Sequence, residues 1–545
     1  MSKSENESEI CIEEIKRKVF SYHKNHLFFK MNSSLAFLYA FLIFEIQCNA
    51  TYFSKFAVTT DQRMILDKYL DSIATLIYWI YEEIDQNGAL DLNINDKYLD
   101  YSFEIFEMAR RCSDLRTLFY SNKKEENISI DGERIIFKFS HNNVESVTSV
   151  IADSINGKIP IPENETLNKL RESILNLRKN IKIENGKINY ELSHDIIEGF
   201  KREQTFHWEY DSQFDKYWNA ESFEKFSYSS FKKFWIALST WCYVHQYSFI
   251  IYKEVNNRLA ENTLLIRHKG EYIKTISNIA EINYLECEEI FDYLTYDSKI
   301  KNNDIIFQPL FHLIDDIFLI SPHLILRSNA ERNLITLLHK KKDEIYFGKL
   351  TNFREKIMQN DLNCSIKNSE ECIIALNKNI KNMELDYAIY DPKSKNVLLC
   401  ELKWSNEPDS AAEVISHEEY LQKGCKQIKK IQNYAKSNSD EFMNVIFNIK
   451  DKDEIEYSCC VISKNYIRTQ DTTVPVLNLN QFINTYNIEN GNIENLIKQI
   501  NERRYLTPLP TNLCDIKEEK AVCKYAGYIF EVPTIYRINL NNYYS

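Results

Sequence analysis

The spacing of apolar residues changes character near residue 345. Up to about residue 115, aromatic and aliphatic residues recur at helical spacing, as in DKYLDSIATLIYWIYEEI (67–84). The stretch ISIDGERIIFKFS (128–140) instead alternates around Asp131-Gly132, which predicts a β-hairpin insert. Helical spacing resumes near residue 164. We therefore expect residues 1–270 to form a mainly helical sensor or regulatory region.

Residues 271–344 mix short helical and strand-like segments, and we expect them to form a connecting subdomain. The pattern then predicts a helix at TNFREKIMQNDL, strands at ECIIAL, LDYAIY and NVLLCELKW, a second helix, and a strand at EYSCCVIS. We expect the second helix to begin with a capping box at Ser416-His417-Glu418-Glu419. This αβββαβ order predicts a mixed α/β domain within residues 345–545, and hence a multidomain protein.

The longest apolar run indicates a buried helix and not a membrane span. LAFLYAFLIF (35–44) stops at Glu45, which is about half of the ~20 residues that a span requires. The N-terminal stretch MSKSENESEI is polar and acidic and lacks an apolar signal region. The chain is therefore expected in the cytoplasm, with no membrane partner.

Composition excludes several classes of function. The 13 cysteines include no CxxC pair, which argues against zinc ribbons and disulfide scaffolds. The three GK dipeptides, at Gly157, Gly186 and Gly348, lack the glycine five positions earlier that a phosphate-binding P-loop needs. The net charge of −12 repels a negatively charged nucleic acid, so any nucleic-acid partner must bind to a local basic patch.

Charged residues interrupt the predicted hairpin 383–404 where a core strand would be apolar. If residues 391–396 form the turn, Asp386 falls opposite Glu401, with Cβ atoms ~5 Å apart. Lys403 lies two positions beyond Glu401, on the same face. Two carboxylates at that distance repel by about 3 kcal/mol at an effective dielectric of ~20. A hard divalent cation, Mg²⁺ (or Mn²⁺), would offset this repulsion.

A lysine beside such a cation can orient or deprotonate an attacking water and stabilise charge on a phosphorane-like transition state. The three residues therefore indicate phosphodiester hydrolysis. Two alternatives stay open. Glu384 falls opposite Lys403, so a cross-strand ion pair would also explain the lysine, and a one-residue bulge would break the facing arrangement.

At these positions the sequence resembles the PD-(D/E)XK nuclease superfamily, which has the restriction-endonuclease-like fold. The resemblance rests on Leu385-Asp386 and Glu401-Leu402-Lys403, and it covers roughly residues 345–480. Leucine stands where the first motif position often has proline. The resemblance implies Asp386 and Glu401 as metal ligands and Lys403 as the catalytic lysine.

The same resemblance implies two further residues. Many members carry a glutamate on the helix before the sheet, and Glu355 is the best match here. Some recombination-repair-type members carry a glutamine on the helix after the sheet, where Gln427 stands. A cytosolic nuclease with a large helical region and no motor also resembles bacterial anti-phage effectors.

The predicted helix after the third strand carries a candidate nucleic-acid surface. An apolar stripe of Leu421, Cys425, Ile428 and Ala435 lies opposite three lysines at helical spacing. Lys423, Lys426 and Lys430 would either track a phosphate backbone or form an ordinary solvated face.

The sequence therefore predicts a Mg²⁺-dependent nuclease, with DNA a more favoured substrate than RNA. RNA cleavage by the same site is one alternative. A non-catalytic nucleic-acid-binding scaffold on a nuclease fold is the other. A homo-oligomer is compatible with the sequence, and nothing in it identifies a protein partner.

Overall fold

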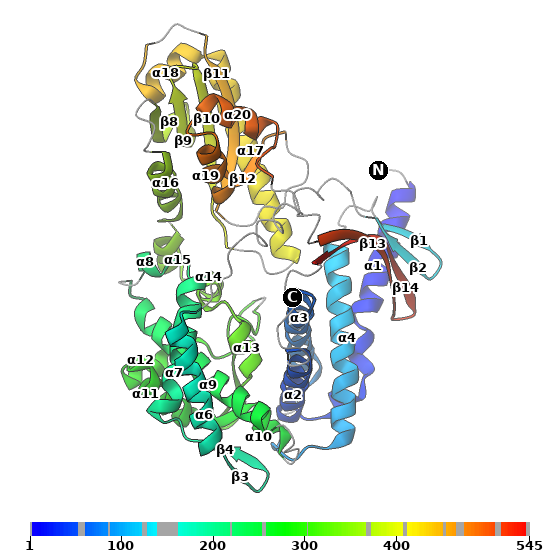
Figure 1. The fold of residues 1–545 in the computed structure, drawn as a ribbon. Helices are drawn as coiled ribbons and strands as arrows, with labels where there is room; N and C mark the ends of the chain where they lie inside the picture. Colours follow the sequence, from blue (N-terminus) through cyan, green and yellow to red (C-terminus); the bar gives the residue numbers. More distant parts are fainter. Residues whose placement is uncertain are drawn as a thin grey trace. The chain divides into compact units, whose positions relative to one another are not determined.

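The computed structural model describes residues 3–52, 60–85, 88–121, 128–138, 162–218, 221–252, 258–301, 303–351, 353–366, 372–406, 411–450, 454–464, 473–506 and 514–540 (Figure 1). The chain forms two compact units. One, here called the helical unit, comprises residues 1–116 and 159–347. The other, here called the α/β unit, comprises residues 117–158 and 348–543. The protein is thus multidomain and mixed α/β.

The helical unit begins with the long helices that the aromatic-rich pattern predicts. They are α1 (Lys3–Phe20), α2 (Ser33–Tyr52), α3 (Thr60–Glu83) and α4 (Asp96–Ser121), with short 3-10 helices at Tyr22–Asn25 and Leu27–Lys30. The last residues of α4, from Thr117, belong to the α/β unit. α2 carries the longest apolar run. Its stretch Ser33–Thr51 has the length and apolar composition of a bilayer span, and 67% of that stretch is buried inside the protein.

The rest of the helical unit combines helices with two small sheets. Its helices are α6 (Asn164–Asn180), α7 (His194–Asp211), α8 (Asp215–Trp218), α9 (Tyr228–Ile251), α10 (Leu259–Thr263), α11 (Lys269–Ala280), α12 (Tyr284–Tyr293), α13 (Pro322–Arg327), α14 (Ala330–Lys340) and α15 (Glu344–Thr351), the last of which crosses the boundary between the units. Its strands are β3 (Lys182–Glu184), β4 (Lys187–Asn189), β5 (Leu265–His268), β6 (Leu310–Ile314) and β7 (Ile317–Ile320).

The structure divides this region differently from the sequence interpretation. β5 lies before the predicted boundary at residue 270, and β7 lies after it. The two strands pair antiparallel in one three-stranded sheet of order β5-β7-β6. Residues 271–344 therefore belong to the helical unit, because main-chain hydrogen bonds cross the predicted boundary.

The predicted hairpin insert is present but contributes to the α/β unit. β1 (Ile128–Asp131) and β2 (Arg134–Phe137) pair antiparallel across a turn in which Gly132 has a φ of 62°, and residues 139–140 lie outside the described part. β2 then pairs in parallel with β14 (Tyr528–Leu540), whose other neighbour is β13 (Cys514–Tyr525). Figure 1 shows the cyan hairpin beside the red C-terminal strands. Pairing over some 400 residues of sequence has no local signal.

The α/β unit is built on a five-stranded sheet of order β12-β11-β10-β9-β8. Its strands are β8 (Ile373–Ile380), β9 (Met383–Asp391), β10 (Asn396–Lys403), β11 (Glu456–Ser463) and β12 (Val476–Asn478). Its helices are α16 (Phe353–Ile366), α17 (Ala411–Ser437), α18 (Ser439–Phe447), α19 (Leu479–Ile488) and α20 (Ile493–Asn501). β10, β11 and β12 run parallel, while β9 runs antiparallel to both of its neighbours.

Side chains of the central strands alternate between the two faces of this sheet, and both faces are buried. Val397 and Leu399 pack with Leu421 and Ile428 of α17 in one apolar core. Leu398, Cys400 and Leu402 point to the other side and are fully buried as well. The second face adjoins α16, since the hydroxyl of Tyr387 donates to Asn363 of that helix.

Two details of this unit differ from expectation. α17 begins at Ala411, so Ser416 to Glu419 lie inside the helix and the predicted capping box there is wrong. His417 is instead buried and meets the hydroxyl of Ser405, a contact between helix and strand end. In addition, α18 follows α17 before β11, where the sequence pattern indicated one helix.

Candidate active site

The β9–β10 hairpin brings the predicted residues to the edge of a regular ladder. Its register pairs Val397 with Tyr390 and Leu399 with Ala388, as the hairpin arithmetic predicts, and it ends at Cys400 and Tyr387. The next pair would be Glu401 with Asp386, but the main-chain ladder does not continue to them. The two strands therefore separate at the candidate site.

Asp386 sits in a break that affects both of its neighbouring strands. On the β8 side, the ladder passes from Leu376–Tyr387 to Lys378–Leu385 and skips Asn377, whose φ is 47°. On the β10 side, the amide of Leu402 donates to Asp386 Oδ2 at 2.8 Å. The side-chain carboxylate of Asp386 thus accepts a hydrogen bond that a main-chain carbonyl of β9 would accept in a regular sheet. Asp386 is thereby held next to the end of β10, near Glu401.

A polar pair from outside the hairpin replaces the missing ladder bonds. Gln359 of α16 donates through Nε2 to the main-chain oxygen of Asp386 at 3.1 Å. The same amide exchanges hydrogen bonds with the side chain of Asn377. Buried main-chain groups need such partners, so Gln359 and Asn377 stabilise the irregular strand that positions Asp386.

Three charged groups are buried together at this break. Asp386, Glu401 and Lys403 keep only 7%, 3% and 8% of their surface exposed. Lys403 Nζ donates to Glu401 Oε1 at 2.6 Å. Lys403 therefore pairs with its own-strand neighbour Glu401, whereas Glu384, the alternative partner, is exposed on β9.

Burial and mutual repulsion oppose ionisation of the two carboxyl groups. Burial raises the pKa of Asp386 to about 7, the charges of Glu401 and Glu355 add to this, and the Leu402 amide lowers it. Burial also raises the pKa of Glu401, an effect that Lys403 partly offsets. Burial lowers the pKa of Lys403, but Glu401 outweighs this effect and leaves the pKa above its ordinary value.

The carboxylates keep acceptor capacity that the described protein groups do not use. Among the described residues, hydrogen bonds reach Asp386 at Oδ2 and Glu401 at Oε1, and none reaches Asp386 Oδ1 or Glu401 Oε2. A free oxygen on each of two neighbouring carboxylates is a ligand set that suits Mg²⁺ or Mn²⁺. The charge of Glu401 contributes to the raised pKa of Asp386, and a bound cation would relieve that repulsion.

Glu355 lies near Asp386 and Glu401 but does not form a three-ligand group with them. It is exposed on α16, and its charge raises the pKa of Asp386 and of Glu401. Within the described residues, the three possible metal ligands whose ligand atoms lie within 4.8 Å of one another are His23, Glu82 and Glu83, in the helical unit. Glu355 therefore marks the solvent side of the cluster.

Two residues of α17 that the sequence interpretation missed contact the cluster. Lys403 Nζ lies 5.3 Å from the ring centroid of Tyr420, a cation–π distance. A Cβ atom on Gly424 would come within 3.1 Å of Lys403 Cε and 3.4 Å of Glu401 Cγ. Gly424 thus lets the helix approach the two charged side chains. A glycine inside an amphipathic helix was the available sequence signal.

The candidate nucleic-acid surface has the predicted exposure. Lys423, Lys426, Gln427 and Lys430 are all exposed on α17, while Leu421, Cys425, Ile428 and Ala435 are buried. Gln427 lies one helical turn beyond Gly424, by spacing on the same side of the helix. The lysines surround that side and point to solvent, and no structural feature assigns them a ligand.

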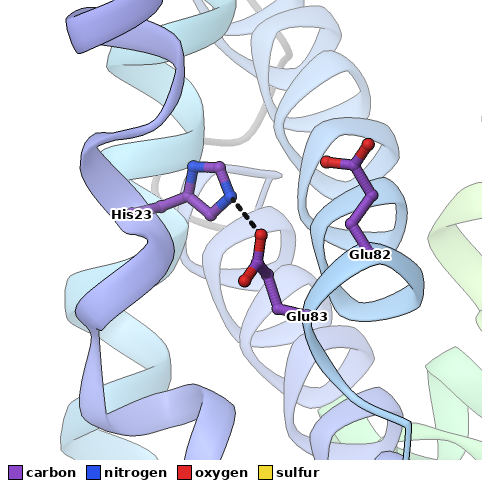
Figure 2. Close-up of side chains that lie close together, drawn as sticks. All are labelled: His23, Glu82 and Glu83. Carbon is purple, nitrogen blue, oxygen red and sulfur yellow. Dashed lines mark ion pairs between the residues drawn. The ribbon is translucent and has the colours of Figure 1, made fainter.

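A second group of possible metal ligands lies in the helical unit. The ligand atoms of His23, Glu82 and Glu83 lie within 4.8 Å of one another, and His23 Nε2 is 3.8 Å from Glu83 Oε1 (Figure 2). Burial lowers the pKa of His23 to about 4. Glu83 already pairs with Lys24 at 3.2 Å, and Glu82 accepts the hydroxyl of Tyr78. Both carboxylates therefore have protein partners.

Comparisons with family models, with curated proteins and with solved structures find no match to this chain.

Proposed function

We propose that the α/β unit is a metal-dependent nuclease that hydrolyses phosphodiester bonds, with DNA as the favoured substrate. The observation that carries this proposal is the convergence of Asp386, Glu401 and Lys403 at the point where β9 and β10 separate. The order α16-β8-β9-β10-α17-α18-β11 supports it, because it contains the αβββαβ succession of the restriction-endonuclease-like fold.

In this proposal Asp386 Oδ1 and Glu401 Oε2 would hold the divalent ion, with Glu355 as a further carboxylate whose charge acts on both groups. A bound Mg²⁺ would polarise the scissile phosphate and lower the pKa of a coordinated water. The chain supplies orientation. The Leu402 amide fixes Asp386, and Glu401 fixes the ammonium of Lys403.

The electrostatics favour a particular role for Lys403. The charge of Glu401 keeps the pKa of Lys403 above its ordinary value, so the Lys403 side chain is protonated at neutral pH. A protonated ammonium stabilises negative charge that develops on the phosphate. Lys403 is therefore assigned to orientation and charge stabilisation.

The burial of the cluster favours a second candidate function. Three groups that are 3–8% exposed, two of them joined as an ion pair, also fit a structural cluster in a non-catalytic nucleic-acid-binding scaffold. In the nuclease proposal, the phosphate must enter on the side marked by the exposed Glu355 and the partly buried Tyr420.

Cleavage assays separate these functions. Purified full-length protein would be incubated with supercoiled plasmid or with a structured RNA, in Mg²⁺, Mn²⁺ or EDTA. We expect plasmid nicking that depends on the metal and falls by about 10²- to 10³-fold in Lys403→Ala, the range for loss of one transition-state donor. Lys498→Ala, an exposed position on α20, serves as the charge-matched control.

Each other outcome has a distinct meaning. Cleavage of RNA alone would assign the same site to RNA. Metal-independent binding without cleavage of either substrate would support the scaffold. Undiminished cleavage by Lys403→Ala would reject the assigned mechanism.

A further inference from the structure

The helical unit contains a cavity of about 1340 Å³ that the proposed nuclease chemistry does not use. It lies between α7 and α11, with β4, Trp241 of α9 and Arg267 of β5 among its lining groups. Ligand sites usually enclose about 300–1,000 Å³. This space is therefore large enough for a ligand with more than one ring system.

The two helices that border the cavity line it mainly with polar residues, together with Ile197, Phe206 and Ile279. Residues 194, 198, 201, 202, 205 and 209 of α7 recur at three- and four-residue spacing, as do residues 271, 274, 275 and 278 of α11. Polar faces that do not pack against each other leave a hydrated space, which a polar ligand can fill.

Most of the charged residues that line the cavity already form ion pairs or hydrogen bonds with other protein groups. Arg202 pairs with Glu165 and Glu198 at 2.7 and 3.0 Å. Lys201 donates to the main-chain oxygen of Ile279 at 2.7 Å and lies 3.4 Å from Glu281. These rim cations are therefore already committed to protein groups.

Two other cations that line the cavity, Arg267 and Lys274, have fewer protein partners. Arg267 donates through Nη1 to the adjacent main-chain oxygen of Ile266, and its Nε lies 3.8 Å from a carboxylate oxygen of Glu271, which is 57% exposed. A guanidinium has five N–H donors, and hydrogen bonds from Arg267 to the described residues use one of them. Lys274 is exposed one helical turn after Glu271 and makes no ion pair within the described residues.

Fixed aromatic groups stand beside Arg267. The indole of Trp241 donates to the hydroxyl of Tyr190 at 3.3 Å, and that hydroxyl lies 2.9 Å from His245 Nδ1. Burial lowers the pKa of His245 to about 3, and the positive charge of Arg267 adds to the effect. The imidazole is therefore neutral, and the chain of hydrogen bonds holds both aromatic rings in place.

From this combination we infer that the cavity binds a nucleotide-class ligand, either a mononucleotide or a short oligonucleotide. Arg267 and Lys274 would bind phosphate, since charge-assisted hydrogen bonds to phosphate are the strong ones. Tyr190, which is partly buried, would contact a base, and Asn189 and Asn278 offer amide groups at the cavity wall. The inference is independent of the proposed nuclease site.

Calorimetric titration of the full-length protein in EDTA tests this inference. The probes are ATP, the dinucleotide pApA, adenosine as the base alone, and tripolyphosphate as the anion alone. We expect ATP or pApA to bind more tightly than either half-probe. Whichever of the two binds more tightly identifies the ligand size.

Variants place the binding site. Arg267→Ala and Lys274→Ala should each weaken binding by about tenfold or more, whereas Lys233→Ala, exposed on α9 and outside the cavity lining, should not. Lys274 is exposed, so its variant keeps the test valid if Arg267→Ala proves unstable by circular dichroism. Absence of binding by all four probes, or equal binding by wild type and Lys274→Ala, would overturn the inference.

Discussion

Both compact units bury carboxylates, in different surroundings. In the helical unit, Glu331 is 5% exposed and accepts hydrogen bonds from the hydroxyls of Ser212 and Tyr228 and from the amides of Gln213 and Phe214, at 2.5–3.3 Å. Glu45 likewise accepts from Ser321 and from the amide of His323.

In the α/β unit, Asp386 and Glu401 are equally buried but receive one amide and one ammonium between them. They also face each other's charge, which the isolated Glu331 does not. A carboxylate that supports the fold has its lone pairs filled by donors. A pair that keeps free oxygens raises the free energy of the folded protein, a cost that either protonation or a bound cation would offset.

Replacing each carboxylate by its amide tests this contrast, and the largest effect is expected at Glu331. In Glu331→Gln the new NH₂ group meets donors instead of acceptors, so we expect a loss of roughly 2–3 kcal/mol in the free energy of unfolding at pH 8. Urea unfolding measures it. Glu224→Gln, an exposed position of the same unit, should change stability by less than about 0.5 kcal/mol. A neutral Glu331→Gln would contradict the structural role.

Asp386→Asn should have the opposite sign. The pKa of Asp386 is about 7 in the folded protein, above its ordinary value of 3.8. Its contribution to stability is therefore fully present below pH 3.8 and is lost as pH rises through about 7. At pH 8 the amide should stabilise the metal-free protein by roughly 1–3 kcal/mol, with a smaller gain at pH 5. Unfolding curves at both pH values measure the difference.

Added metal sharpens this test. Mg²⁺ or Mn²⁺ should raise the melting temperature of the wild type at pH 8, because a ligand that binds the folded state stabilises it. Asp386→Asn should lose this response. An equal shift in both proteins would place metal binding elsewhere, and His23→Ala would then examine the cluster of Figure 2.

The lysines of α17 should affect binding more than folding. Reversing Lys423, Lys426 and Lys430 to glutamate should weaken DNA binding by about tenfold and flatten its dependence on salt, since fewer counterions are released. The reference variant carries Lys378→Glu and Lys498→Glu, which are exposed on β8 and α20. Unchanged binding, measured by fluorescence anisotropy at several salt concentrations, would show that the lysines form a solvated face.

Gly424→Ala is expected to give the smallest effect. The added methyl group must displace Lys403 by a few tenths of an ångström, so we expect cleavage to fall about five- to tenfold. Stability should change by less than about 1 kcal/mol, because alanine also favours the helix. Gly348→Ala in α15, where a Cβ atom meets nothing within 4 Å, isolates the helix effect. Full activity of Gly424→Ala would show that the close approach has no role.

The sequence by itself determined the local elements of this protein. Period-3.6 spacing located the long helices, and period-2 runs with a polar turn located β9 and β10 and paired them in the observed register. That register was enough to place Asp386, Glu401 and Lys403 near one another, because strand pairing across a short turn is a local property.

Only the tertiary structure decided the rest. The strand break at Asp386 depends on Gln359 of α16, the pairing of β2 with β14 joins distant segments, and the approach of Gly424 depends on how α17 packs. Burial raised the carboxylate pKa values, and the cavity beside Arg267 formed between helices. These features depend on contacts between segments that are remote in sequence, and periodicity carries no information about such contacts.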